Sequence, residues 1–247
     1  MTMLRARRLV SAVVAASLTV GGLSACRSQP AVAVYIGQGG PITEHRVQQI
    51  WDDTSDLLKA AADGRPARMP IARADVVGLL LTNELYDRVA ERDRVTLPAT
   101  MPYDEVAGQI GLPATADITR LYTENAVLRQ TLLQSVAATA PAQPTDEDLR
   151  EVYQRFADNE AINSDFAAFK NSLQAADKQE LQGAFALRDS VESLVGELDV
   201  EVSPRYENLE LAISSYTDQN SGRSFPIVSV PFGETGSDSQ PLVVDVS

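Results

Sequence analysis

The side chains that most often act as nucleophile, base or metal ligand are scarce, because cysteine and histidine each occur once in 247 residues, as Cys26 and His45. A lone thiol cannot form an internal disulfide, and one histidine without cysteine partners makes no metal site of the usual type. We interpret His45 as a solvated residue in a first helical turn rather than as a catalytic base. The acidic stretches "WDDTSD" and "TDEDLRE" lack the alternating ligands and glycine of a calcium loop. Nucleotide-binding glycine motifs are also missing, so we predict no catalytic residue, no metal site and no cofactor.

The surroundings of Cys26 favour a different chemistry. Arg5, Arg7 and Arg8 precede an uncharged run, rich in Val, Ala and Leu, from Leu9 to Ala25. A basic start followed by a short apolar segment and small residues is typical of an export signal. The alternative is that Cys26 is a small hydrophobic residue of the core, but a polar stretch, "RSQP", follows it.

The tetrapeptide Leu23-Ser24-Ala25-Cys26 resembles the lipobox of bacterial lipoproteins. In that family the cysteine sulfur receives diacylglycerol and the signal is cut just before it. The resemblance implies that residues 1–25 are a lipoprotein signal peptide and that Cys26 is the lipidation site. Residues 26–30 would be a short tether, and the rest of the chain would work at the extracytoplasmic face of the cell membrane. Two or three acyl chains suffice for stable anchoring.

Charge restricts the partners of the remaining chain. The whole chain has a formal net charge of −13 at neutral pH, and removing the three arginines of the signal makes the rest about −16, which disfavours nucleic acid and anionic lipid and would attract basic segments of other polypeptides. A second apolar run of membrane-spanning length is not seen in the sequence. The length that follows the signal is enough for one sizeable core.

Hydrophobic periodicity predicts a mainly α fold. Apolar residues at helical spacing follow Thr43, a plausible N-cap, and Thr145 with Asp148 resembles a capping box. Short strands are expected near Val32–Ile36 and Val200–Val202, and we predict that they pair with each other in a minimal two-stranded sheet, because an isolated strand leaves its backbone groups unpaired. Helices are expected over the remaining periodic stretches, at about residues 43–63, 72–92, 103–110, 115–138, 145–156 and 164–196, the last with a possible break near 176.

The order of these elements resembles the N-terminal domain of the periplasmic chaperone SurA and related extracytoplasmic foldases. The resemblance rests on an ordered set of segments, "ITEHRV", "LLLTNELYDRVAERDRVTLP", "PTDEDLREVYQRF" and "VEVSPRY", and covers residues 31–206. Members of that family often carry a parvulin-type prolyl isomerase domain before the last segment. The gap is too short for it here, and the histidines of such a site are missing, so we interpret the isomerase as absent. Residues 207–247 lie outside the resemblance and are predicted to be a low-complexity, mobile tail.

The resemblance implies a lipid-anchored chaperone-like protein that binds unfolded or exported polypeptides without covalent chemistry. Five aromatic side chains on or near apolar helical faces have two interpretations: they belong to the core, or they line a groove for extended polypeptide. Two alternative functions stay open: a prolyl isomerase with a degenerate site, and an adaptor for one folded partner. The five aromatic residues are Trp51, Tyr86, Tyr122, Tyr153 and Phe156.

Overall fold

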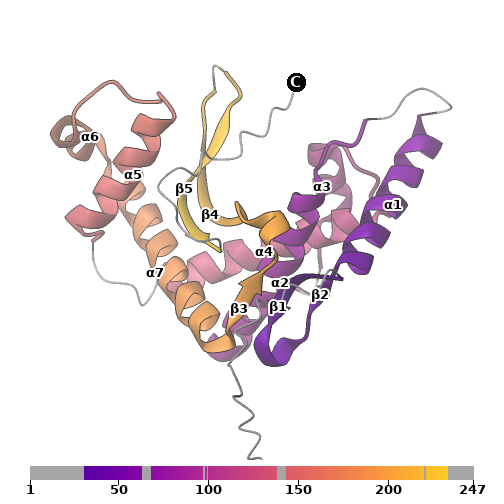
Figure 1. The fold of residues 1–247 in the computed structure, drawn as a ribbon. Coiled ribbons are helices and arrows are strands. Elements are labelled where there is room, and N and C mark those ends of the chain that lie inside the picture. The colour runs from indigo at the N-terminus through magenta and orange to yellow at the C-terminus, as the bar shows by residue number, and fades with distance from the viewer. Residues whose placement is uncertain are drawn as a thin grey trace, which may run out of the picture.

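A computed structural model describes residues 31–232, apart from 63–67, 97, 99, 138–142 and 220. This part of the chain is mainly α-helical, with two small antiparallel sheets (Figure 1). Its helices are α1 (Glu44–Ala61), α2 (Arg73–Asp93), α3 (Tyr103–Ile110), α4 (Asp117–Ala137), α5 (Asp146–Asp158), α6 (Phe166–Ser172) and α7 (Ala175–Leu198). Its strands are β1 (Val32–Ile36), β2 (Ile42–Thr43), β3 (Val200–Val202), β4 (Glu210–Thr217) and β5 (Ser224–Pro231).

The first sheet confirms the predicted pairing of the two strands that flank the helices in sequence. β1 and β3 are antiparallel, with Val34 opposite Val202 and Ile36 opposite Val200. The sheet has three strands rather than two, because β2 pairs with the other edge of β1. β2 is only two residues long, which is too short to give a periodic signal in the sequence.

The turn after β1 requires glycine. A Cβ atom on Gly37 would lie 2.1 Å from the carbonyl oxygen of Leu198, at the end of α7, and the φ angle of Gly37 is positive. Only glycine lets the backbone after β1 approach the end of α7 this closely. The start of α1 follows the sequence prediction, because the Thr43 side chain accepts a hydrogen bond from the Arg46 amide at 3.2 Å.

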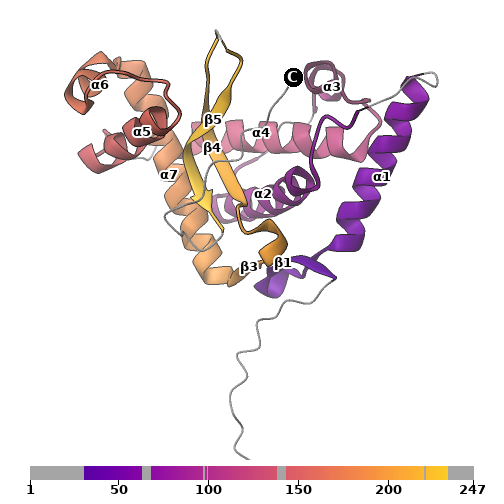
Figure 2. The same ribbon diagram turned by 45° about the horizontal axis from the view of Figure 1, so that its top comes forward.

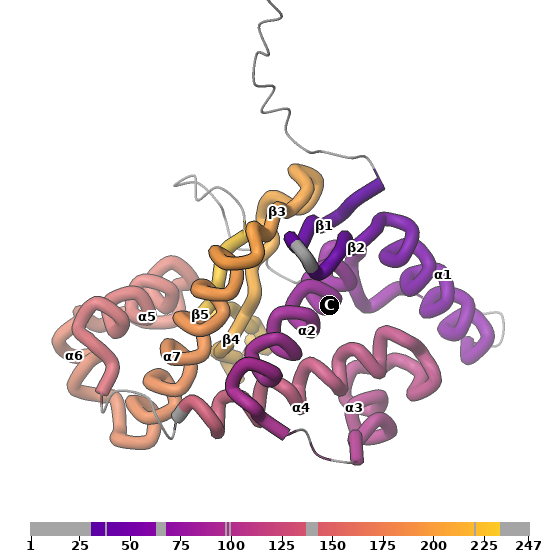
Figure 3. The backbone as a smooth tube through the Cα atoms, turned by 90° about the horizontal axis from the view of Figure 1, so that it is seen from below, coloured from indigo at the N-terminus to yellow at the C-terminus, as the bar shows by residue number. Residues whose placement is uncertain are grey.

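The main core is built by α2, α4 and α7, which pack against one another. α2 is surrounded, since α1, α4, α7 and the first sheet all contact it. Its sequence has apolar residues on most of its circumference, as a buried helix needs. Figures 1 and 3 place α1 at one end of the molecule and the α5–α6 pair at the other.

The C-terminal hairpin overturns the prediction of a mobile tail for residues 207–232. β4 and β5 pair along their length, and Leu211, Ile213, Val228 and Val230 are buried. Part of the segment rich in Ser, Asp and Gly that suggested a tail, residues 218–223, joins the two strands. In Figure 2 this hairpin stands between the two ends of the molecule, beside α7. Residues 233–247 lie outside the described part of the chain.

The predicted long helix from residue 164 to 196 is two helices, α6 and α7, separated at Leu173–Gln174. The signal peptide, the tether and Cys26 all lie outside the described residues. Among the described helices, none is both long enough and apolar enough to cross a bilayer.

Candidate functional site

The five aromatic residues proposed from the sequence lie in different environments. Tyr86 is fully buried in α2, so its assignment to a client-binding groove is wrong. Trp51 on α1 and Tyr122 on α4 are partly buried and pack against the core. Tyr153 and Phe156 lie on one face of α5 and are the two that the fold brings together.

Tyr86 and Tyr122 have the electrostatics of core residues. Burial raises the pKa of the Tyr86 phenol well above its usual range, and its hydroxyl has no hydrogen-bond partner among the described residues. Burial, with a smaller contribution from Asp75, raises the pKa of Tyr122 to about 12. Trp51 instead carries the guanidinium of Arg73 over its ring, 4.9 Å from the centroid.

Around Tyr153 and Phe156 the fold assembles what we call the aromatic cluster. The chain has fourteen aromatic residues, seven Tyr, six Phe and one Trp, and six of them meet here. They come from α5, α6 and both strands of the hairpin, with centroid separations between 4.8 and 5.9 Å, which is the range of favourable edge and tilted ring contacts. The members are Tyr153, Phe156, Phe166, Phe169, Tyr216 and Phe225.

Phe156 is at the centre of the aromatic cluster. Its ring lies 4.8 Å from Tyr216, 5.5 Å from Phe225 and 5.9 Å from Phe169, centroid to centroid. Tyr153, one helical turn earlier, continues the contact to Phe169 at 5.7 Å. The spacing of three residues puts Tyr153 and Phe156 on the same helical face, and the hairpin register puts Tyr216 opposite Phe225.

The members of the aromatic cluster differ in their exposure to solvent. Phe169 and Phe225 are buried, whereas Tyr153, Phe156 and Phe166 are partly exposed. Tyr216 is the large hydrophobic side chain that remains exposed among the described residues, at 37%. The cluster therefore has a buried floor and an accessible edge, which ends on the hairpin.

Polar groups at the margin of the cluster fix its orientation. The Tyr153 hydroxyl donates to the backbone oxygen of Ser164 at 3.0 Å, which holds the loop between α5 and α6 against the ring. The Arg150 guanidinium lies 4.9 Å from the centroid of Phe166. Lys170 of α6 forms an ion pair with Asp146 in the first turn of α5.

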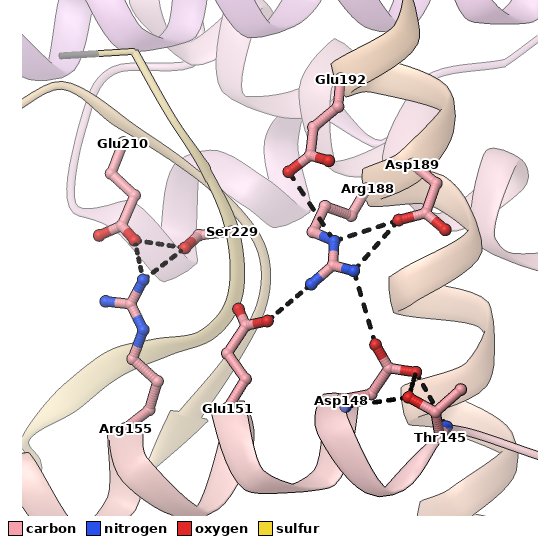
Figure 4. Close-up of polar contacts among 9 residues, drawn as sticks. All are labelled: Thr145, Asp148, Glu151, Arg155, Arg188, Asp189, Glu192, Glu210 and Ser229. Carbon is pink, nitrogen blue, oxygen red and sulfur yellow. Dashed lines mark hydrogen bonds and ion pairs between the residues drawn. The ribbon is translucent and has the colours of Figure 1, made fainter. Parts of the chain in front are cut away.

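Helix α5 is anchored to α7 through Arg188. This guanidinium reaches Glu151 at 2.7 Å and Asp148 at 3.6 Å on α5, and Asp189 at 3.1 Å and Glu192 at 3.8 Å on its own helix (Figure 4). One cation is thus shared by four carboxylates. Burial, followed by the nearby Asp189 and Glu151 charges, raises the pKa of Glu192, although Arg188 acts in the opposite direction.

The capping box at the start of α5 belongs to the same network. Asp148 accepts from the Thr145 amide at 2.9 Å, and the Thr145 hydroxyl accepts from the Asp148 amide at 3.1 Å, as predicted from the sequence (Figure 4). Asp148 therefore both caps α5 and pairs with Arg188. Leu149 and Val152 are buried on the same helix, so α5 is held by an apolar face as well as by charge.

A second anchor ties α5 to the hairpin. Arg155 donates to Glu210 of β4 at 2.7 Å and to the Ser229 hydroxyl of β5 at 3.0 Å, and Ser229 in turn bonds to Glu210 (Figure 4). This triad crosses both strands, so it sets the position of the hairpin relative to α5. Phe156 follows Arg155 directly and contacts the same two strands through Tyr216 and Phe225.

A separate hollow of about 620 Å³ lies at the end of α2 and was not predicted from the sequence. Charged residues line much of it, including Glu84, Asp87, Arg88 and Glu91. Arg88 is paired with Glu84 at 2.6 Å. Burial, then the neighbouring carboxylates, raises the pKa of Asp87. Elsewhere, His45 is exposed in the first turn of α1, and no cluster of metal-ligating side chains is found among the described residues.

Four members of the aromatic cluster were missed from the sequence. Phe166 and Phe169 have the same spacing as the pair on α5, which is a local signal for one face of a short helix. Tyr216 and Phe225 are a cross-strand pair that becomes visible only once the hairpin is recognised. Their convergence with α5 depends on tertiary packing, which no local pattern gives.

Comparisons with known proteins do not assign this arrangement to a family. No protein-family model, no curated protein and no solved structure matches the chain. The mainly α architecture with small antiparallel sheets therefore stands on the structure alone, and the likeness to the SurA N-terminal domain remains a prediction from the sequence.

Proposed function

We propose that the chain is a lipid-anchored, extracytoplasmic, chaperone-like protein that binds unfolded or exported polypeptides without covalent chemistry. The observation that carries the proposal is the aromatic cluster, with its partly exposed edge formed by Tyr153, Phe156, Phe166 and Tyr216. The aromatic cluster contains Tyr153 and Phe156, which are two of the five residues predicted from the sequence. Its other four members were identified from the structure.

The arrangement of the rings suits contact with apolar segments of varied sequence. Aromatic rings give large apolar contact areas and lose little conformational freedom on binding. The rings of the cluster brace one another, so they are ordered before a client arrives. Each exposed anchor contributes roughly 1–2 kcal/mol, so a few of them support reversible binding at micromolar or weaker affinity once the cost of association is subtracted.

Lipidation at Cys26 would localise this activity to the membrane surface. Acyl chains on Cys26 would hold the folded part at the membrane surface, where exported chains emerge, and the tether is short. Binding by mass action needs no nucleotide: the bound client is shielded while it is held, and it is released by dissociation.

The experiment is an aggregation assay with the full chain in detergent micelles and several chemically unfolded clients, without ATP. We expect stoichiometric amounts to slow aggregation and Tyr216→Ala to weaken the effect severalfold. The variant should stay folded at the assay temperature, with a small fall in melting temperature, because Tyr216 is 37% exposed but its ring also contacts Phe156 and Phe225. Tyr103→Ala is the matched control, because Tyr103 is a partly exposed tyrosine on α3, and this helix contributes no residue to the aromatic cluster.

Three other outcomes would change the assignment. Equal suppression by wild type, Tyr216→Ala and Phe166→Ala would remove the aromatic cluster as the binding surface. No suppression at several-fold molar excess, with one stoichiometric partner in crosslinking, would favour the adaptor function. Acceleration of a proline isomerisation assay would favour a prolyl isomerase.

A further inference from the structure

The hairpin has two free edges. β4 and β5 pair only with each other among the strands of the described residues, so each has one edge without a strand partner. Such an edge presents backbone N–H and C=O groups to any extended polypeptide. The two edges of this hairpin are chemically different.

The backbone groups that face outward follow from the hydrogen bonds at the two ends of the hairpin. The amide of Phe232 donates to Leu209 O at 3.0 Å, and the amide of Asp218 donates to Arg223 O at 2.8 Å. In an antiparallel pair, hydrogen-bonded positions alternate with positions whose N–H and C=O point away from the partner strand. Counting inward from both ends as far as the register shift around Ser214 gives four outward positions on each strand: Glu210, Ala212, Ser215 and Thr217 on β4, opposite Pro231, Ser229, Pro226 and Ser224 on β5.

Proline closes the edge of β5. Two of its four outward positions, Pro226 and Pro231, have no N–H to donate. Helix α5 also packs against this strand. The outward positions of β4 all keep their N–H groups, and Ala212, Ser215 and Thr217 are exposed. The edge of β4 therefore keeps all its outward donors and acceptors, arranged as two short runs, Glu210 with Ala212 and Ser215 with Thr217, on either side of the register shift at Ser214.

Charge favours a basic occupant for this edge. The whole chain has a net charge of −13, and the unit from Thr145 to Ser172, which packs against β5, carries seven acidic and three basic side chains, a net charge of −4 before its ion pairs with Arg188 are counted. A second copy of the chain would bring the same negative charge, so pairing between copies through β4 is disfavoured. An added strand that carries lysine or arginine is instead attracted.

We propose that the outer edge of β4 binds an extended client segment with lysine or arginine side chains by adding it as a third strand of the hairpin sheet. This inference rests on the proposed binding of polypeptides and names the class of segment and its mode of binding. The segment would lie beside Tyr216, the exposed end of the aromatic cluster. Backbone pairing gives affinity for varied sequences, and the charge gives selectivity.

The test measures peptide binding by fluorescence anisotropy with the full chain in detergent micelles. The probe is a fluorescein-labelled peptide of alternating valine and lysine, about ten residues long so that it spans one strand. Comparison peptides replace lysine with glutamate, or carry N-methyl groups on alternate backbone nitrogens. We expect the lysine peptide to bind about tenfold or more tightly than either comparison peptide, because each of them loses the charge or the backbone pairing.

The matched variants are Ser215→Pro and Ser215→Ala. Proline at this outward position removes an edge donor but no hydrogen bond to β5, so the hairpin is retained, and we expect roughly a severalfold loss of affinity. Alanine keeps the amide, so its affinity should equal that of the wild type. A second measurement avoids the variants: on adding the lysine peptide, hydrogen exchange at the amides of Ala212, Ser215 and Thr217 should slow.

The outcomes separate this inference from the proposed function. Equal affinity of Ser215→Pro and Ser215→Ala, with unchanged exchange at the β4 amides, overturns pairing at this edge. If aggregation suppression still depends on Tyr216, the proposed function survives that result. Equal binding of the lysine and glutamate peptides overturns the basic occupant. Concentration-dependent dimers abolished by Ser215→Pro would show that the occupant is a second copy, and no binding of any client or peptide overturns both proposals.

Discussion

Replacing Arg188 with methionine should destabilise the attachment of α5 to α7. The side chain of Arg188 is 16% exposed and neutralises carboxylates from both helices, so methionine would keep much of the packing while leaving four negative charges together. Removing one partner from a buried ion pair costs about 3–5 kcal/mol, since the other charge is left uncompensated.

The expected magnitude is lower than that range because some of the pairs are open to solvent. Asp189 is 67% exposed and Glu192 48%, whereas Asp148 and Glu151 on α5 are 20% and 39% exposed. Pairs at exposed carboxylates contribute little, so we expect a loss of about 2–3 kcal/mol. In a chain of this size that loss lowers the melting temperature by about 4–12 °C.

The assay is thermal and urea unfolding followed by far-UV circular dichroism. Lys59→Met is the control, because the exposed pair between Lys59 and Asp56 should contribute less than about 1 kcal/mol. Adding Glu151→Gln to Arg188→Met should recover part of the loss, because it removes one uncompensated carboxylate. A melting temperature of Arg188→Met equal to that of Lys59→Met, or no recovery in the double variant, would refute the reasoning.

Three further predictions concern single residues. Tyr86→Phe should leave the free energy of unfolding unchanged or raise it by up to about 1 kcal/mol, because it removes a buried hydroxyl without a partner among the described residues; a marked loss in urea unfolding would contradict this. Glu192→Gln should raise the melting temperature near neutral pH. The raised pKa of Glu192 means that its contribution to stability is present below its unfolded pKa and is lost as the pH rises through its folded pKa, so the gain should vanish in acid, and a gain independent of pH would argue against it. Cys26→Ala should abolish incorporation of a palmitate analogue in metabolic labelling, whereas equal labelling would exclude Cys26 as the lipidation site.

The sequence predicted the elements whose signals are local. The cap at Thr43 and the capping box of Thr145 with Asp148 were visible because a cap needs specific side chains within four residues. The pairing of β1 with β3 also followed, since two short strands at the ends of a helical segment need partners for their backbone groups.

The hairpin was missed because two properties of its sequence conceal it. The loop from Asp218 to Arg223 is polar and rich in turn residues, which resembles disorder. β5 contains Pro226 and Pro231, which demote it as a strand in any local analysis. Both prolines are accommodated because they lie at outward positions of an edge strand.

The candidate site was predicted in part for a related reason. Tyr86 and Tyr153 look alike in the sequence, since each lies on an apolar face of a helix. They differ because α2 is enclosed by α1, α4, α7 and the first sheet, whereas α5 lies at one end of the molecule (Figure 1) and Tyr153 stays partly exposed. The number of elements that pack around a helix is a property of the tertiary fold, which periodicity within that helix does not contain.

The central claim is that polypeptide clients contact the edge of the aromatic cluster, and site-specific photo-crosslinking tests it most directly. A photoreactive phenylalanine derivative would replace Tyr216 in the cluster or, as the matched control, Tyr103 on α3. With unfolded clients added to the full chain, the account predicts strong client crosslinks from position 216, little from position 103, and competition by unlabelled client. Crosslinks of equal yield at the two positions, or none at position 216 while aggregation is still suppressed, would contradict it.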